Sequence, residues 1–315
     1  MTPLSDVVRH RLEQCATLPS DTARRVCQVR SRTIELFPEL VTPHDVLPDE
    51  GPCPGCGTPQ PAGGVLSLVE EVCALRPAAD TAIDQCHVDP ASLARRLLAL
   101  CTSRPMARTR VAFVGDDDLA SVALLRLAPP EKLLLLDIDE RIMGLVRHEA
   151  NQRRLNDRVS IERSDLSARE DVEHITARYG EAFDVVVTDP PYAEDGMARF
   201  VEVAMVLAAY TAEVHIAVPA LLAEAWTDEL LHSVQSRLVT SGFLIDRIVP
   251  GAFTYETSDV VSSLVIARRL PGAPVRGAPV RGAPRPERTG RFYTTRAVPE
   301  QVPLFSHSTE TERQP

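Results

Sequence analysis

The sequence predicts an α/β fold built on a seven-stranded, mostly parallel sheet, and three observations support this prediction. Short apolar stretches follow one another through the middle of the chain, helical patterns separate the earlier ones, and the last two are closely spaced. Strands that alternate with helices form right-handed crossovers and a sheet covered on both faces. The close spacing of the last two favours an antiparallel pair at one edge. The predicted strands are 109–115, 132–139, 158–165, 183–192, 213–219, 243–250 and 262–269.

The composition is that of a globular protein with an acidic surface. Of the 315 residues, 44% are hydrophobic, which is enough for one substantial core and a small accessory domain. The net charge of -10 disfavours nucleic acid as a partner and is compatible with a cationic ligand. No apolar run is long enough to span a bilayer and no signal segment is visible, so we expect a cytoplasmic protein without a membrane partner. Assembly as a homodimer is compatible with the sequence.

Changes in composition divide the chain into three parts. Residues 1–105 are expected to form an N-terminal helical domain with a CxxC loop and a linker helix, which Asp89 caps and Pro90 begins. Residues 106–270 contain the predicted sheet. Residues 271–315 are rich in Pro, Gly and Arg, and we expect a disordered tail there.

The cysteines suggest a reducing compartment and one metal candidate. There are 7, scattered and odd in number, which does not fit a disulfide framework. Cys53 and Cys56 form a CxxC that could supply half of a structural zinc site. The further ligand candidates are His44, Cys73, Cys86 and His87. No second CxxC exists, so a metal-free surface turn is the preferred interpretation and zinc is the alternative.

Acidic residues stand at the carboxyl ends of successive predicted strands, which converge on one crevice in a doubly wound sheet. They are Asp116, Asp117 and Asp118, then Asp137 and Asp139, then Asp165, then Asp189. A carboxylate after the second strand can accept two hydrogen bonds from ribose hydroxyls, which favours Asp137, with Asp139 as the alternative. Asp165 is placed to accept from an adenine amino group. Any one acid could be a helix N-cap, but acids at four strand ends in series favour a ligand site.

The fourth predicted strand ends in the tetrad DPPY, residues 189–192. Seven strands in this order are typical of class I methyltransferase-like, or Rossmann-like, sheets. In amino-directed methyltransferases the tetrad aims a nitrogen lone pair at an electrophilic carbon. Asp189 and a carbonyl positioned by Pro190 would bond the nitrogen, and Tyr192 would pack against the substrate. The structural alternative is a proline turn with a core tyrosine.

The turn after the first strand carries Gly115 and then three aspartates, whereas S-adenosylmethionine enzymes usually have a glycine-rich turn there. Two unit charges about 4 Å apart interact by roughly 4 kcal/mol at an effective dielectric near 20, so clustered carboxylates take up protons or need cations. The carboxylate of S-adenosylmethionine would be repelled. Decarboxylated S-adenosylmethionine presents only positive groups, and a polyamine acceptor would add more positive charge.

Four segments together resemble the branched-chain polyamine synthases, the N4-bis(aminopropyl)spermidine synthase family of aminopropyltransferases. These segments are DQCHVDPASLARR, GDDDLASVALL, LLLLDIDERI and FDVVVTDPPY. The resemblance covers about 84–270. It implies a methyltransferase-like catalytic domain preceded by a small N-terminal domain. It also implies transfer of an aminopropyl group from decarboxylated S-adenosylmethionine to an amine of spermidine or a related polyamine, with release of methylthioadenosine.

The resemblance also implies roles for individual residues. Gly115 and the three aspartates after it would surround the aminopropyl group and the acceptor, Asp137 would hold the ribose, Asp165 the adenine and Asp189 the reacting amine. Tyr255 and Glu256 lie where the family has an aromatic and acidic stretch, which implies contact with substrate. We expect Asp189, helped by Asp117, to accept the proton of the amine.

Two other functions stay open at the level of sequence. The first is an S-adenosylmethionine-dependent N-methyltransferase acting on an amine, which DPPY favours and the acidic turn disfavours. The second is a nonenzymatic regulator whose N-terminal helices and CxxC bind nucleic acid, which the negative net charge disfavours.

Overall fold

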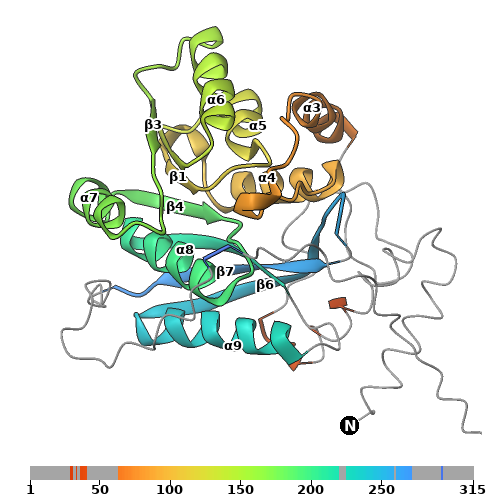
Figure 1. Ribbon diagram of the computed structural model, residues 1–315, viewed down its shortest axis with the longest axis vertical. Coiled ribbons are helices and arrows are strands. Elements are labelled where there is room, and N and C mark those ends of the chain that lie inside the picture. Colours follow the sequence, from red (N-terminus) through yellow and green to blue (C-terminus); the bar gives the residue numbers. More distant parts are fainter. Residues whose placement is uncertain are drawn as a thin grey trace, which may run out of the picture.

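The protein is built on one seven-stranded sheet with helices on both faces (Figure 1). The computed structural model describes residues 29–30, 33, 36–40, 63–219, 225–258, 260–271 and 292–293. The strand order is β3-β2-β1-β4-β5-β7-β6. Strand β7 is antiparallel to both of its neighbours, and the other neighbouring strands are parallel. The predicted α/β fold and its antiparallel edge pair are confirmed.

All of the predicted strands form, with shifted ends. They are β1 Arg110–Val114, β2 Lys132–Asp137, β3 Val159–Arg163, β4 Phe183–Thr188, β5 Ala208–Pro219, β6 Phe243–Thr254 and β7 Val261–Arg269. Strand β6 runs through Pro250, beyond its predicted end. Proline is tolerated there because β6 is the edge strand of the sheet. Strand β4 ends before the two prolines of DPPY.

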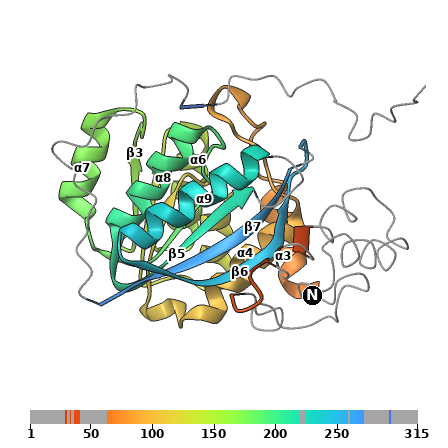
Figure 2. The same cartoon turned by 90° about the horizontal axis from the view of Figure 1, so that it is seen from below.

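The described helices lie in two layers, and the strand residues alternate between them. Val111 and Phe113 of β1 face one layer, whereas Ala112 and Val114 face the other. The first layer contains α3 Gly63–Cys73, α4 Pro90–Ser103, α5 Ala120–Leu127 and α6 Glu140–Gln152; the second contains α7 Arg169–Tyr179, α8 Glu194–Leu207 and α9 Ala225–Thr240. Figure 2 shows α8 and α9 side by side across the second face. Two short 3-10 helices, η1 Thr81–Ile83 and η2 Met106–Arg108, flank α4.

The described part of the predicted N-terminal domain packs directly on the sheet. Val69 of α3 and Leu97 of α4 belong to the same buried apolar cluster as Val111 of β1. The predicted boundary at 105/106 therefore does not separate two hydrophobic cores among the described residues. As predicted, Asp89 accepts the N–H of Ser92 and Pro90 begins α4.

Several predictions fall on parts of the chain that are not described. Cys53 and Cys56, most of 1–62 and most of 271–315 lie outside the described residues. Within the predicted tail, Phe292 and Tyr293 are described: Phe292 packs against the buried apolar cluster beside Phe200, and the ring of Tyr293 contacts that of Phe292. Among the described residues, no helix is both long enough and apolar enough to cross a membrane.

Candidate active site

The carboxyl ends of the central strands meet around the turn that follows β1. The Gly115 N–H donates to the carbonyl oxygen of Leu136 on β2 over 2.9 Å, and the Asp116 N–H donates to Oδ2 of Asp137 over 2.9 Å. Gly115 has a φ of +73°, which favours glycine, and a Cβ there would lie 3.1 Å from the ring of Phe200. The structure thus brings together the acids that follow β1 and β2.

Asp116 is buried and stabilises the start of α5. Its Oδ1 accepts the N–H of Ala120 over 2.8 Å, and its Oδ2 accepts the N–H of Ser121 over 3.0 Å. Burial raises the pKa of Asp116 to about 7, although the hydrogen bonds from Ser121 oppose the shift. Both oxygens therefore serve the helix, and the predicted contact of Asp116 with a ligand stays a prediction.

Asp118 is fully buried and is balanced by the protein's own arginines. It accepts the Val88 N–H over 2.8 Å and Nη1 of Arg96 over 2.9 Å. Nη2 of Arg76 lies 3.4 Å from its Oδ1. The clustered carboxylates of the turn were predicted to take up protons or to need cations. At Asp118 the cations are Arg96 and Arg76 of the protein itself, so this residue needs none from a ligand.

Asp117 has neither the arginine hydrogen bond of Asp118 nor the helical N–H groups of Asp116 among the described residues. Its Oδ2 accepts the N–H of Cys86 over 3.1 Å. Burial raises the pKa of Asp117 well above its ordinary value, and the charges of Asp118 and Asp189 raise it further. This residue is therefore a carboxylate with a high proton affinity.

Asp189 follows β4 and shares its environment with Asp117. Nη2 of Arg96 donates to its Oδ2 over 2.5 Å, and the hydroxyl of Tyr255 donates to both carboxylate oxygens over 3.3 Å. Burial raises the pKa of Asp189, whereas the charge of Arg96 lowers it. The side chain is 13% exposed, so one end of the carboxylate can be approached from outside.

The predicted substrate residues occupy different depths. The hydroxyl of Tyr192 bonds Oγ of Ser262 over 2.6 Å and also bonds the hydroxyl of Tyr255. Burial and the charge of Asp189 raise the pKa of both tyrosines well above the ordinary value, so they stay phenols. Pro190 is buried, whereas Glu256 is 46% exposed at the rim, with Oε1 lying 3.5 Å from Nη1 of Arg76.

The structure distinguishes the two acids after β2. Asp139 is the N-cap of α6 and accepts from Gln85, and its hydrogen bond with Arg141 lowers its pKa to about 2. Among the described residues, Asp137 accepts from backbone N–H groups, including those of Asp116 and Asp139, and burial raises its pKa to about 6. Because no side chain of the described residues is recorded as bonding it, Asp137 is the better candidate for a ribose contact.

Asp165 and Tyr293 lie in the same neighbourhood. Oδ1 of Asp165 accepts from the N–H and the hydroxyl of Ser167, over 2.9 and 2.6 Å. Burial raises the pKa of Tyr293 to about 12, and the negative charges of Asp165 and Asp137 add to the shift. Tyr293 therefore lies near both of the acids predicted to hold a nucleoside.

Phe292 and Tyr293 are residues that the sequence analysis missed. The ring of Phe292 lies 6.1 Å from that of Phe200, which in turn packs near Gly115. At Gly196, in the first turn of α8, an added Cβ would collide with the carbonyl oxygen of Phe292. The adjacent aromatic residues inside a Pro/Gly/Arg-rich segment were the signal that could have been used.

The loop before α4 was also missed as part of the site. The Cys86 N–H holds Asp117, the Val88 N–H holds Asp118, and the side chain of Gln85 holds Asp139. Val88 also forms an isolated antiparallel bridge with Tyr255. Its sequence lies within DQCHVDPASLARR, so only the family resemblance pointed to it.

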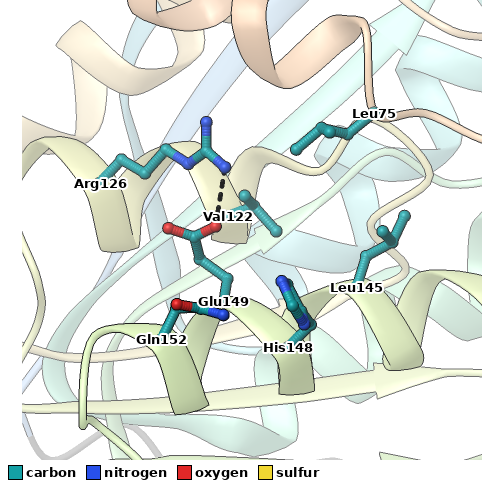
Figure 3. Close-up of a pocket in the computed structure, with 7 residues that line it drawn as sticks. All are labelled: Leu75, Val122, Arg126, Leu145, His148, Glu149 and Gln152. Carbon is teal, nitrogen blue, oxygen red and sulfur yellow. Dashed lines mark hydrogen bonds and ion pairs between the residues drawn. The ribbon is translucent and has the colours of Figure 1, made fainter.

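A separate cavity of about 550 Å³ lies in the first helix layer (Figure 3). Figure 3 shows Arg126 of α5 paired with Glu149 of α6, beside His148. Leu75, Val122, Leu145 and Gln152 complete the lining. None of the strand-end carboxylates lines this cavity, so it is distinct from the candidate site.

In the described ranges, no group of three or more His, Cys, Asp or Glu residues is placed to hold a metal ion. Cys73 and Cys86 are free thiols, and burial raises the pKa of both.

Comparison with known proteins identifies the family. The model of the branched-chain polyamine synthase A C-terminal domain matches residues 64–293. The chain belongs to the branched-chain polyamine synthase family. The matched residues include α3, α4, the whole sheet and Tyr293, so the family domain contains every described residue assigned to the site.

Two curated relatives of this polyamine synthase family member come from Methanocaldococcus jannaschii. An uncharacterized protein of Methanocaldococcus jannaschii is 27% identical over 208 residues, which cover 66% of this chain and 50% of that protein. The N(4)-bis(aminopropyl)spermidine synthase of the same organism is 30% identical over 137 residues, covering 44% of this chain and 37% of that protein. The chain thus spans half or less of the length of these two relatives.

A solved structure shares the fold. It is the branched-chain polyamine synthase C9 mutein from Thermus thermophilus, in complex with N4-aminopropylspermidine and 5'-methylthioadenosine. The TM-score is 0.61 at 18% identity, with 88% of this chain and 90% of that chain covered. The similarity confirms the predicted methyltransferase-like, Rossmann-like architecture.

Proposed function

We propose that this protein transfers an aminopropyl group from decarboxylated S-adenosylmethionine to an amine nitrogen of a spermidine-like polyamine, releasing methylthioadenosine. The observation that carries the proposal is the pair of partly buried carboxylates Asp117 and Asp189, of which only Asp189 accepts from an arginine among the described residues. A crevice with surplus negative charge favours cationic ligands. Membership of the polyamine synthase family supports the same reaction.

The nucleoside part of the donor is assigned to the acids after β2 and β3. Asp137 would accept from the ribose hydroxyls and Asp165 from the adenine amino group, and Tyr293 would form a wall beside them. Asp116 would act by fixing the turn. Tyr255 and Tyr192 would support Asp189, and Glu256 at the rim would meet the outer, cationic part of the acceptor.

The reaction is an in-line displacement. The lone pair of a neutral amine attacks the methylene carbon next to the sulfonium, the carbon–sulfur bond breaks, and its electron pair stays on the sulfur of methylthioadenosine. Orientation supplies much of the acceleration because the sulfonium is already a good leaving group. The proton lost by the acceptor nitrogen passes to the carboxylates of Asp189 and Asp117.

Mass spectrometry of reactions with each donor tests the proposal. The protein is incubated with a panel of polyamines and either decarboxylated or intact S-adenosylmethionine. We expect aminopropylated polyamine and methylthioadenosine from the decarboxylated donor only. Methylated amine from the intact donor, without aminopropyl product, would overturn the proposal in favour of an N-methyltransferase. The panel also identifies the acceptor, and light scattering of the same sample tests for the homodimer.

A further inference from the structure

Arg96 is a buried arginine that the proposed reaction does not yet use. It lies on α4 and is 4% exposed, with its guanidinium carbon 4.5 Å from the centroid of the Phe253 ring. Burying a guanidinium is costly unless its charge is paired and its donors are satisfied. The groups that it contacts therefore indicate what its charge does.

The guanidinium joins the ends of two strands. Nη1 donates to Oδ2 of Asp118 after β1, and Nη2 donates to Oδ2 of Asp189 after β4. A planar guanidinium fixes both acceptors in direction as well as in distance. Asp189 is therefore held through Oδ2, while its Oδ1 meets only the more distant hydroxyl of Tyr255 among the described residues.

We infer that Arg96 is a positioning residue that keeps Asp189 ionised and turns its Oδ1 toward the acceptor amine, so that Asp117 receives the proton. This inference rests on the proposed aminopropyl transfer. Asp189 would accept a hydrogen bond from the amine and orient its lone pair. Asp117 would take a proton from the acceptor ammonium, so that the neutral amine attacks, and would release that proton to solvent.

The surroundings of the two carboxylates support this division. Asp189 faces Arg96 from α4, Asp117 and Asp118 from the turn after β1, Tyr192 after β4, Tyr255 after β6, and Cys86 from the loop before α4. Asp117 faces Asp118, Asp189 and Asp137, which raise its pKa, and the charge of Arg96, which lowers it. Among the described residues it accepts a hydrogen bond only from the Cys86 N–H. The carboxylate without the arginine hydrogen bond is the better proton acceptor.

The test measures pH profiles of kcat for Arg96→Met and Arg96→Lys. Loss of the guanidinium should raise the pKa of Asp189, which would then stay protonated to higher pH. The acidic limb of kcat in Arg96→Met should therefore move upward by about one pH unit or more. We expect kcat at neutral pH to fall about a hundredfold, because the amine is no longer aimed. Arg96→Lys keeps the positive charge but cannot bond Asp118 and Asp189 at the same time. Its acidic limb should therefore lie closer to that of wild type than the limb of Arg96→Met does, while its kcat recovers less.

A matched control and two further variants separate this role from a structural one. Arg104→Met removes the arginine at the C-cap of α4, which bonds the Thr211 carbonyl, and should keep the wild-type profile. Asp117→Asn should give a kcat that rises about tenfold per pH unit, because deprotonation of the amine in solution replaces the lost base. Asp189→Asn should lower kcat at every pH while leaving the Kd of methylthioadenosine unchanged. An unshifted acidic limb in Arg96→Met would overturn the inference.

A second measurement does not depend on turnover or on one variant. Carboxyl ¹³C NMR of wild type, with Asp189→Asn used to assign the signal, gives the pH at which Asp189 titrates. We expect this pH to be lower in wild type than in Arg96→Met, with Arg96→Lys closer to wild type, and equal values in wild type and Arg96→Met would overturn the inference. If wild type yields no aminopropyl product, the proposed function fails while the NMR result still decides whether Arg96 keeps Asp189 ionised.

Discussion

At the scale of single residues, three identical side chains in a row have three different environments. Asp116 bonds the start of α5, Asp118 is paired with arginines, and Asp117 has no arginine hydrogen bond among the described residues. The sequence predicted the cluster but not this division. The partners come from Arg76, Cys86, Val88 and Arg96, which are remote in sequence, and no local pattern reports such contacts.

The division predicts opposite effects on stability. Asp116→Ala removes two acceptors from helical N–H groups and should lower the free energy of unfolding by about 1–2 kcal/mol. Asp117→Asn keeps an oxygen for the Cys86 N–H and removes a repelled charge, so it should raise the free energy of unfolding at neutral pH. Urea denaturation of the ligand-free protein measures both. A less stable Asp117→Asn would mean that its charge is compensated.

At the scale of elements, sequence patterns predicted every strand and missed mainly their ends. Pro250 and Gly251 predicted the end of a strand, but β6 continues through both. It can do so because it is an edge strand with a register shift between Val249 and Phe253. That extension is what carries Tyr255 to the site. Tertiary pairing with β7 determines it, and the local sequence does not report this pairing.

The start of α8 gives a prediction about the contact that Tyr293 is proposed to make with the nucleoside. Gly196→Ala would drive a methyl group into the carbonyl of Phe292 and the ring of Pro191, so Phe292 and Tyr293 should move away. We expect the Kd of methylthioadenosine, measured by calorimetry, to rise about threefold to tenfold.

Gly144→Ala is the matched control, because a Cβ at Gly144 of α6 would have no atom within 4 Å. It should leave the Kd unchanged and add about 0.5–1 kcal/mol to stability. An unchanged Kd in a folded Gly196→Ala protein would remove Tyr293 from the proposed nucleoside site.

At the scale of the whole molecule, the topology and the position of the site followed from the order of strands and from the acids at their ends. The charge balance of the site did not follow from the order of strands or from the acids at their ends. Two of the charges that it depends on, those of Arg76 and Arg96, come from the segment before the sheet, which the prediction had assigned to a separate domain. The packing of α3 and α4 on the sheet brings them to the acids.

This charge balance predicts proton release on binding. The folded-state pKa values of Asp116 and Asp137, about 7 and about 6, lie above their ordinary values, so the stability that these groups contribute is present near pH 4 and is lost as pH rises through 6 and 7. A cationic donor favours the ionised forms. Decarboxylated S-adenosylmethionine should therefore release up to about one proton near pH 6.5.

Methylthioadenosine, which is uncharged, should release fewer protons than the cationic donor. Calorimetry in buffers of different ionisation enthalpy measures the difference directly. Equal proton release for the two ligands would contradict the charge argument.

The bridge between Val88 and Tyr255 ties the stretch preceding the sheet to the far edge of the sheet. A polypeptide shortened to start at β1 would keep the hydrogen bonds between its strands. It would lose the N–H groups of Cys86 and Val88 that bond Asp117 and Asp118. The smallest fragment that binds a ligand should therefore include the loop before α4, and the sheet without that loop should not bind one.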